Sequence, residues 1–480
     1  MGASTLSRLT VEQPRPLPLS AKLLYGAGEI PITVLMVLSG LFILFFYNSV
    51  MGLPASLVGI GVSASLVLDA LIDPYIGHLS DRIRHPLGRR HAFMLPGALA
   101  MGPCFFLLFS PPRSLGKPAL FLWLIVISVI LRIAAAIYRI PYLSMGAEIS
   151  LDYDDRTSTM AVRAIFGLVG TLAAAGLSFL LFFPATADGS EPKLQYAGYP
   201  HLGLAFGALM TVTGLISLFG TLRYRTFGGS QSSGAPRYFA AFRSSMRNGA
   251  FRHIWVSTTV FFLAVVLNAT LAIHYFTWYA LVSGRSLSLV QTCFYLGALA
   301  GVFVWMALAR RTEKRTLYII STAATATLLL MATLLIGAGH PLGTGNLTAL
   351  IIGHALAGVF ASAVWVIPAS MVADVTDTDE LSSGLRREGI YYGIMNFGEK
   401  VAAGGALFLA GVLLTAFGKL SPGAHTGVPG GPPAAAPYLG FLFGVVPAGL
   451  LLVALLFILP YRLDRRTVHG IRQQLTSRQS

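Results

Sequence analysis

Residues 118–146 read PALFLWLIVISVILRIAAAIYRIPYLSMG and form a long, almost uninterrupted apolar run. A helix needs ~20 apolar residues to cross the ~30 Å hydrocarbon core of a bilayer, and this run is longer. Because lipid offers no hydrogen-bond partners, a chain that spans it forms helices or a closed barrel. Barrel strands are ~10 residues long and alternate in polarity, which this run does not. It therefore predicts a transmembrane helix.

Similar apolar runs occur on both sides of this stretch. Of the 480 residues, 55% are hydrophobic and only 11% are charged, whereas a soluble domain has about 25% charged residues. We therefore expect an all-α membrane protein with twelve transmembrane helices. The expected spans are 23–48, 57–80, 91–111, 118–146, 160–184, 202–222, 253–281, 288–309, 316–338, 346–372, 389–416 and 436–460.

The positive charges lie mainly in short loops between these runs. A net charge of +15 would suggest a nucleic-acid partner for a soluble protein. Membrane topology explains it better here, so no nucleic acid is expected. When the loops are assigned alternately to two sides, only Arg113, Lys117, Lys193, Arg285 and Lys419 fall on the outer side. Since cytoplasmic loops carry the excess of Lys and Arg, we expect a multi-pass protein of the plasma (inner) membrane with both termini cytoplasmic.

Two short blocks, one in each half of the chain, are alike. Ile140-Pro141 is followed by Ala147-Glu148-Ile149-Ser150, and Ile367-Pro368 by Ala373-Asp374-Val375-Thr376. Duplicated six-helix halves are typical of secondary transporters, which bind their solute between the halves. We expect a cytoplasmic N-terminal segment at 1–22, pseudo-symmetric six-helix halves at 23–222 and 253–460, a flexible cytoplasmic linker at 223–252 and a basic cytoplasmic tail at 461–480.

Three motifs resemble the glycoside–pentoside–hexuronide:cation symporter family of the major facilitator superfamily. They are Asp69-Ala70-Leu71-Ile72-Asp73-Pro74-Tyr75-Ile76-Gly77, then Ser80-Asp81-Arg82 with Gly88-Arg89-Arg90, and Asp374-Val375-Thr376-Asp377-Thr378-Asp379-Glu380. The resemblance implies the major facilitator fold and a secondary active transporter. Such a protein moves a small organic solute (a glycoside, uronide or related organic anion) by alternating access with a coupling cation. It further implies no enzymatic activity and no cofactor or bound metal, and we expect a monomer surrounded by membrane lipids.

The candidate coupling site consists of Asp69, Asp73 and Arg139. The two aspartates are four residues apart and share a helix face, which suits either a hard cation or proton exchange; a structural salt bridge is the alternative. The resemblance implies that this pair contributes to a sodium site. Arg139, however, stands where the family has an acid, and a guanidinium keeps its charge in a protein. We therefore expect Arg139 near Asp69 or Asp73, with coupling to protons rather than sodium, or no coupling.

Four cations within the expected spans could face the central cavity. Arg132, Arg139, Arg163 and Lys400 together suggest a solute that carries a carboxylate, sulfate or phosphate; internal pairing that cancels their charges is the alternative. Aromatic and amide side chains could bind sugar hydroxyls and ring faces. The full set of candidate solute-binding residues is Thr33, Arg139, Tyr142, Arg163, Trp365, Asn396 and Lys400.

The loop after the second span predicts a conformational latch, formed by Gly77, Asp81, Arg82, Gly88, Arg89 and Arg90. Gly77 would allow close helix packing, and the charges would form a cluster under the opposite half; plain topology signalling is the alternative. Other functions stay open, namely a lysolipid-like amphipathic substrate, an uncoupled uniporter, and a non-transporting membrane sensor or scaffold. The chain has no ATP-binding loop, zinc motif or nucleophile elbow of an enzyme.

Overall fold

The computed structural model describes residues 17–149, 153–184, 191–225, 238–383, 387–419 and 436–479. Within these ranges the chain is helical and contains no strand, and twelve helices are long and apolar enough to cross a membrane. The expected fold class is confirmed. The first half contains α1 (Leu19–Ala27), α2 (Ile30–Phe45), η1 (Phe46–Val50), α3 (Ala55–Arg82), α4 (His91–Leu108), α5 (Lys117–Glu148), α6 (Tyr153–Leu172), η2 (Ala173–Leu177), α7 (Ser178–Phe182), η3 (Pro192–Leu194), α8 (Gly198–Thr221) and η4 (Leu222–Tyr224).

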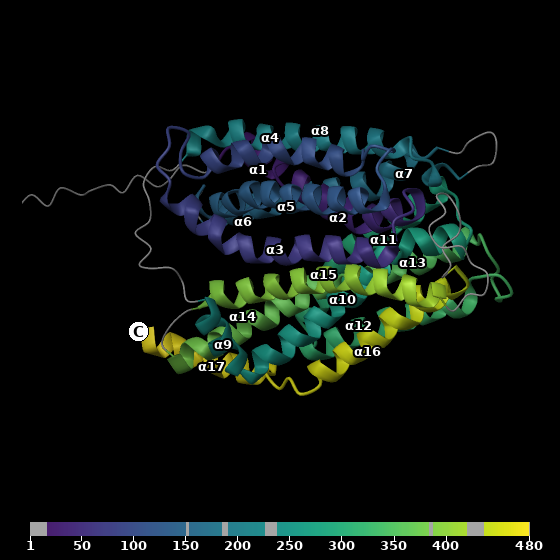
Figure 1. The fold of residues 1–480 in the computed structure, drawn as a ribbon. Helices are drawn as coiled ribbons and strands as arrows, with labels where there is room; N and C mark the ends of the chain where they lie inside the picture. Colours follow the sequence, from purple (N-terminus) through teal and green to yellow (C-terminus); the bar gives the residue numbers. More distant parts are fainter. Residues whose placement is uncertain are drawn as a thin grey trace, which may run out of the picture.

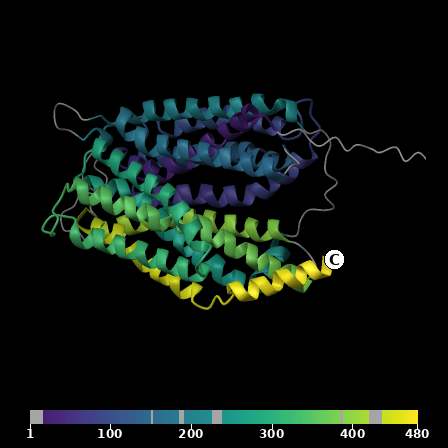
Figure 2. The same cartoon turned by 180° about the vertical axis from the view of Figure 1, so that it is seen from behind.

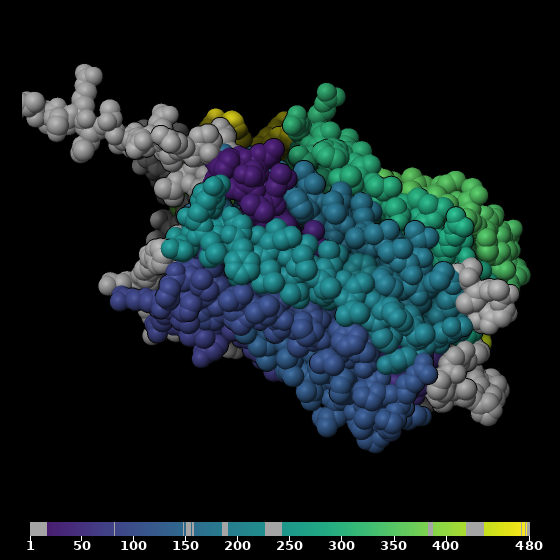
Figure 3. Space-filling model, turned by 90° about the horizontal axis from the view of Figure 1, so that it is seen from above, coloured from purple at the N-terminus to yellow at the C-terminus, as the bar shows by residue number. Residues whose placement is uncertain are grey.

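The second half repeats this arrangement, and Figures 1 and 2 show the two halves as bodies that lie side by side. In Figure 3, α8 (teal) runs along α4 (blue) on the outer face of the first half. The second half contains α9 (Tyr238–Arg247), α10 (Gly249–Trp278), α11 (Gly284–Ala309), α12 (Lys314–Leu335), α13 (Leu347–Ala361), α14 (Ala363–Ser383), α15 (Glu388–Lys419), η5 (Ala436–Tyr438), η6 (Phe441–Val445), α16 (Val446–Ile458) and α17 (Arg465–Gln479).

The segments outside the spans contain more helix than expected. The linker includes α9, which packs against α10 and α15, and the basic tail forms α17, which packs against α14. The glycine- and serine-rich run of the linker, 228–234, lies outside the described residues. The first span begins at Leu19, within the expected N-terminal segment. Polarity alone is therefore a poor guide to where these helices begin and end.

Three spans contain a turn of π-helix, at η1, η2 and η6. A π turn has i→i+5 hydrogen bonds and occurs mostly as a single turn within an α-helix. At η1 the backbone N–H of Met51 donates to the carbonyl of Phe46 at 2.9 Å. Carbonyls of the other two turns accept side-chain donors: Gly176 from Ser288 at 2.6 Å, and Phe443 from Asn268 at 2.8 Å. The π turns at η2 and η6 therefore provide carbonyl groups for hydrogen bonds between neighbouring helices.

The two halves meet closely at one end of the bundle. The start of α3 crosses the end of α15 at Gly59 and Gly411, where the backbones almost touch. A Cβ on Gly59 would lie 2.7 Å from the carbonyl oxygen of Leu407, and one on Gly411 would lie 2.3 Å from that of Ala55. Ser63 also donates to the carbonyl of Gly404 at 2.6 Å across the same interface. This end of the interface is tightly closed.

At the other end α3 and α15 separate, as the left side of Figure 1 shows. A Cβ on Gly389 or Gly393, early in α15, would meet no atom within 4 Å. On α3, Leu71 and Tyr75 are 63% and 67% exposed. The open end carries the arginine-rich loop after α3, together with α9 and α17. The halves are therefore closed at one end and open at the arginine-rich end.

The sequence repeat corresponds to a repeated ion pair at the open end. Glu148, at the end of α5, pairs with Arg90 at 2.6 Å and with Arg89 at 2.8 Å, near the start of α4. Asp374 occupies the equivalent place in α14 and pairs with Lys314 at the start of α12. In each half, an ion pair between an acid of the fourth span and a cation near the start of the third therefore joins these two spans.

The Glu148 pair predicts a loss of stability in acid. Burial raises the pKa of Glu148, but hydrogen bonds from Arg90 and Arg89 outweigh it and hold the pKa below its ordinary value of 4.5. A carboxyl with a lowered folded pKa stabilises fully above its unfolded pKa and ceases to do so as the pH falls through its folded pKa. We expect Glu148→Gln to be less stable than wild type at pH 7, and this difference to shrink below pH 4.5.

Thermal unfolding of the purified protein in detergent, at pH values from 3 to 7 chosen around that pKa, measures this difference. Glu313→Gln serves as the control, because this glutamate is exposed and its hydrogen bond from the Arg465 backbone N–H, at 3.2 Å, can also be accepted by a glutamine oxygen. The difference from wild type should be small at every pH. A constant difference between wild type and Glu148→Gln at all pH values would contradict the prediction.

Candidate transport site

The centre of the molecule holds four charged side chains from three helices. Asp69 and Asp73 lie one turn apart on α3, Arg139 comes from α5, and Lys400 comes from α15 in the opposite half. Arg139 lies 2.6 Å from Asp73 and 4.0 Å from Asp69. Lys400 lies 2.7 Å from Asp69 and also bonds Asp73. The expected closeness of Arg139 to the aspartates is present, and Lys400 adds a bridge between the halves.

This cluster is balanced in charge and largely enclosed by protein. The side chains of Asp69 and Asp73 are 8% and 19% exposed, and that of Lys400 is 14% exposed. Buried charges are tolerated when each has a partner of opposite sign, and here two cations face two carboxylates. One oxygen of Asp73, Oδ1, is buried without a hydrogen-bond partner among the described residues. That oxygen can accept one further hydrogen bond or a proton.

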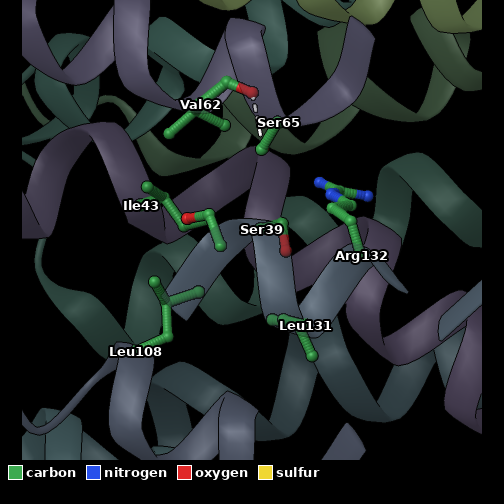
Figure 4. A pocket seen from close by; sticks show the side chains of 8 residues that line it. Ser39, Ile43, Val62, Ser65, Leu108, Leu131 and Arg132 are labelled. Atoms are coloured by element: carbon green, nitrogen blue, oxygen red, sulfur yellow. Dashed lines mark hydrogen bonds between the residues drawn. The ribbon is translucent and has the colours of Figure 1, made fainter. Parts of the chain in front are cut away.

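A second ion pair lies between α2 and α6. Arg163 lies 3.3 Å from Glu29, the residue just before α2. Three of the four cations expected to face the cavity are therefore neutralised by acids within the protein, which was the alternative to an anionic solute. Arg132 is the exception, because it forms no ion pair among the described residues. Figure 4 shows its side chain together with those of Ser39 and Ser65.

Two of the expected solute-binding residues pack inside the first half. Tyr142 is fully buried; its ring stacks on that of Tyr25 at 4.8 Å, and its hydroxyl donates to the Tyr25 carbonyl at 3.2 Å. Thr33 donates to carbonyls of its own helix and lies against Gly170 of α6. In this conformation Tyr142 holds α5 against α1 and has no surface to offer a solute.

Other candidates lie on the open side of the cluster. Asn396 is exposed and lies one turn before Lys400 on the same face of α15. Tyr392 precedes it by another turn, is 37% exposed, and donates to the carbonyl of Ala369 in α14 at 2.9 Å. Trp365, 48% exposed, lies one turn before Ala369. By its four-residue spacing and its exposure, Tyr392 lies on the same face of α15 as Asn396 and Lys400.

The latch residues contact their own half in this conformation. Arg90 donates to Ser80 at 2.9 Å as well as to Glu148, and Arg82 is exposed. Gly88 has a φ of 86°, which favours glycine in the turn before α4. The side chain of Asp81 lies outside the described part of the chain.

The expectation that Gly77 permits close helix packing needs correction. A Cβ placed there would meet Ile140 at 3.5 Å, which is ordinary contact. The close backbone crossing of α3 lies at Gly59 instead. The motif around Gly77 carries charge and turn geometry, and the glycine itself is not needed for packing in this conformation.

Twelve candidate membrane helices among the described residues, a charge cluster between two related halves and close contact at one end are features of a membrane transporter. The family model described as MFS/sugar transport protein matches residues 24–465, and the chain belongs to this family. An uncharacterized symporter from Synechocystis sp. is 27% identical over 96% of this chain and 97% of its own length. The inner membrane symporter YicJ of Escherichia coli K12 is 26% identical over 55% of each chain.

Solved structures show the same fold. A bacterial homolog of the human lysosomal transporter Spinster, in an inward-facing and unoccupied conformation, superposes with a TM-score of 0.61. It is 15% identical and the match covers 95% of this chain and 97% of that one. The family is that of MFS/sugar transport proteins, the relatives are named as symporters, and the fold is that of a transporter and not of an enzyme.

Proposed function

We propose that this protein is a proton-coupled secondary transporter for a glycoside, uronide or related small organic solute. The observation that carries the proposal is the placement of Arg139 and Lys400 on Asp69 and Asp73. Two tethered cations occupy the place where a mobile sodium ion would need oxygen ligands. No third acid, histidine or cysteine joins the aspartates in a metal-binding group among the described residues.

Proton coupling follows from the position of Lys400 in the opposite half. When the halves rearrange, Lys400 must leave α3, because the cluster spans their interface. Asp69 and Asp73 then keep Arg139 as their one ion-pair partner among the described residues, so one carboxylate is left without an ion pair. Such a charge is costly away from water, and a proton on Asp73 Oδ1, the unpartnered oxygen, neutralises it. Protonation and the departure of Lys400 are thereby linked.

Solute binding falls on the open side of the same cluster. Asn396 offers an amide for hydroxyl groups, while Tyr392 and Trp365 offer aromatic faces. These are the groups that small-molecule sites use to orient a ligand. A solute bound there touches the same face of α15 as Lys400, so solute and proton act on one helix.

The arginine-rich loops support the orientation of the molecule. Cytoplasmic loops carry the excess of Lys and Arg, which supports an orientation with the open end, α9 and α17 on the cytoplasmic side. We place the protein in the plasma (inner) membrane as a monomer with both termini cytoplasmic. The open cavity then faces the cell interior.

Flux in proteoliposomes tests the coupling ion. A panel of neutral glycosides and uronates is offered under an inward proton gradient without sodium, and under an inward sodium gradient at equal pH. We expect accumulation with the proton gradient alone, and its collapse when a protonophore is added. Strict dependence on sodium would overturn the proposal. Vesicles without protein, and protein with the proton and sodium gradients absent, serve as controls.

A further inference from the structure

Lys193 lies at the closed end of the molecule, in η3 between α7 and α8, and its side chain is 0% exposed. Lysine is almost never fully buried unless its charge has a partner. The side-chain nitrogen, Nζ, donates a hydrogen bond at 2.8 Å to the backbone carbonyl of Val282, which follows α10 in the second half. A lysine from a loop of the first half is thus buried against the second half.

Other groups of the first half fix the position of this lysine. Glu191, whose side chain is 39% exposed, lies 3.4 Å from Nζ and supplies the opposite charge. The hydroxyl of Tyr199 in α8 donates to the backbone carbonyl of Lys193 at 2.6 Å. Tyr199 is itself fully buried, and its ring stacks on that of Phe46 at 4.3 Å. The backbone of Lys193 is therefore anchored in the first half, while its side chain reaches the second.

The turn that receives the hydrogen bond has an unfavourable backbone conformation. Leu281, just before Val282, has a φ of 54°, in the left-handed region. This region is unfavourable for a bulky residue, and such a conformation persists where surrounding contacts hold it, often in parts that switch. Val282 is held by its own N–H, which donates to the Phe276 carbonyl at 2.8 Å, and by Lys193 at its carbonyl. The opposite half therefore helps to hold this turn.

The bond lies beside a second contact between the halves. The start of α11 packs against η2 and α7, on the right side of Figure 1. A Cβ on Gly284 would lie 3.1 Å from the carbonyl oxygen of Phe183, and Ser288 donates to the carbonyl of Gly176 at 2.6 Å. This contact involves other helices than the crossing of α3 and α15. The closed end is therefore held at two places, and Lys193 bonds across the halves at the second.

We propose that Lys193 is a positioning residue for transport, whose hydrogen bond to Val282 holds this end closed and has to break before the cavity opens there. When the halves separate, water replaces both partners, so the bond can form and break in each cycle. A hydrogen bond from a charged donor can shift a two-state equilibrium by roughly tenfold or more. This role does not depend on which ion drives transport or which solute is carried.

Cysteine labelling of the full-length protein in detergent tests the proposal. Cys104 and Cys293 are changed to serine, and Thr415→Cys at the crossing of α3 and α15 reports opening of the whole end. Lys193→Met keeps an apolar chain of similar length but removes the donor. We expect a hydrophilic maleimide to label the reporter roughly tenfold faster in this variant. Lys117→Met, which changes an exposed lysine at the start of α5, should leave the rate unchanged.

A milder variant keeps the test decisive if Lys193→Met does not fold, which thermal unfolding shows. Tyr199→Phe removes the hydroxyl that holds the Lys193 carbonyl and keeps the buried ring. We expect faster labelling of the same reporter, by a smaller factor than in Lys193→Met. Tyr47→Phe is the matched control, because its buried hydroxyl donates to the Leu108 carbonyl at 2.8 Å and does not contact the lysine. It should leave the labelling rate unchanged.

A second reporter separates opening of the whole end from local loosening. Ser288→Cys lies beside the bond at a position that is 9% exposed, and each reporter is compared with its own parent. Faster labelling at both positions in Lys193→Met supports the proposal. Unchanged labelling at Thr415→Cys, or an equal rise in Lys117→Met, overturns it, and for an unfolded Lys193→Met the result with Tyr199→Phe decides. Labelling requires no solute or ion gradient, so its outcome and that of the uptake experiments are independent.

Discussion

Asp73→Asn is expected to abolish proton-driven accumulation and to lower the free energy of unfolding by about 3–5 kcal/mol, the usual cost of removing one partner from a buried ion pair. The substitution leaves Arg139 and Lys400 with Asp69 as their shared acid. It also replaces the carboxylate proposed to take the proton by an amide, which does not take up a proton in this pH range. Both effects come from the same carboxyl group, so the loss of stability and the loss of coupling should occur together.

A double variant separates the two effects. Adding Arg139→Gln to Asp73→Asn removes the unpaired cation as well, so we expect much of the lost stability to return while accumulation stays absent. Thermal unfolding and gradient-driven uptake in proteoliposomes measure the two properties. Asp464→Asn changes an exposed aspartate outside the spans and should alter neither. Accumulation retained by Asp73→Asn would contradict the assignment of this carboxyl.

Gly411→Val is expected to disfavour closure of the tight end and to slow transport. Its Cβ would lie 2.3 Å from the carbonyl oxygen of Ala55, a backbone atom that cannot move without moving α3. Overpacking of this kind costs about 1–3 kcal/mol, so the equilibrium should shift by about tenfold towards a conformation open at this end. The same argument applies to Gly59, which faces Leu407 from the other side of the crossing.

Cysteine accessibility measures this shift. Thr415, which accepts a hydrogen bond from the backbone of Ser56 at 3.1 Å across the interface, is replaced by cysteine after Cys104 and Cys293 are changed to serine. A membrane-impermeant maleimide should label it faster in Gly411→Val than in the parent. Gly449→Val is the control, because a Cβ there meets nothing within 4 Å. Equal labelling in all three proteins would show that the crossing does not control closure.

Much of the architecture could be predicted because its signals are local. Span length, the bias of Lys and Arg between loops, and the repeat around Glu148 and Asp374 each depend on neighbours in sequence. The same holds for Asp69 and Asp73, which share a face because they lie one turn apart. Their closeness to Arg139 was implied by the family resemblance, in which Arg139 stands where the family has an acid. The helices α9 and α17 were missed, since their polar composition also fits loops.

The rest of the site depends on how helices rotate and pack, which no local pattern determines. Lys400 reaches both aspartates because α15 crosses α3 at this depth. Tyr142 turns inward to stack on Tyr25, although it was expected among the solute-binding residues. Arg132 likewise has no ion-pair partner among the described residues because Asp69, Asp73 and Glu29 pair with other cations. These properties require the assembled bundle.

The π turns have a consequence for how this chain can lengthen or shorten during evolution. Each contains one residue more than the α-helical turn that would replace it. Deleting a residue elsewhere in a span rotates all that follows by about 100° and turns buried faces outward. Deleting one within Phe46–Val50, Ala173–Leu177 or Phe441–Val445 can be absorbed by tightening the turn. Single-residue gaps should therefore gather at these three places when relatives are aligned with this chain.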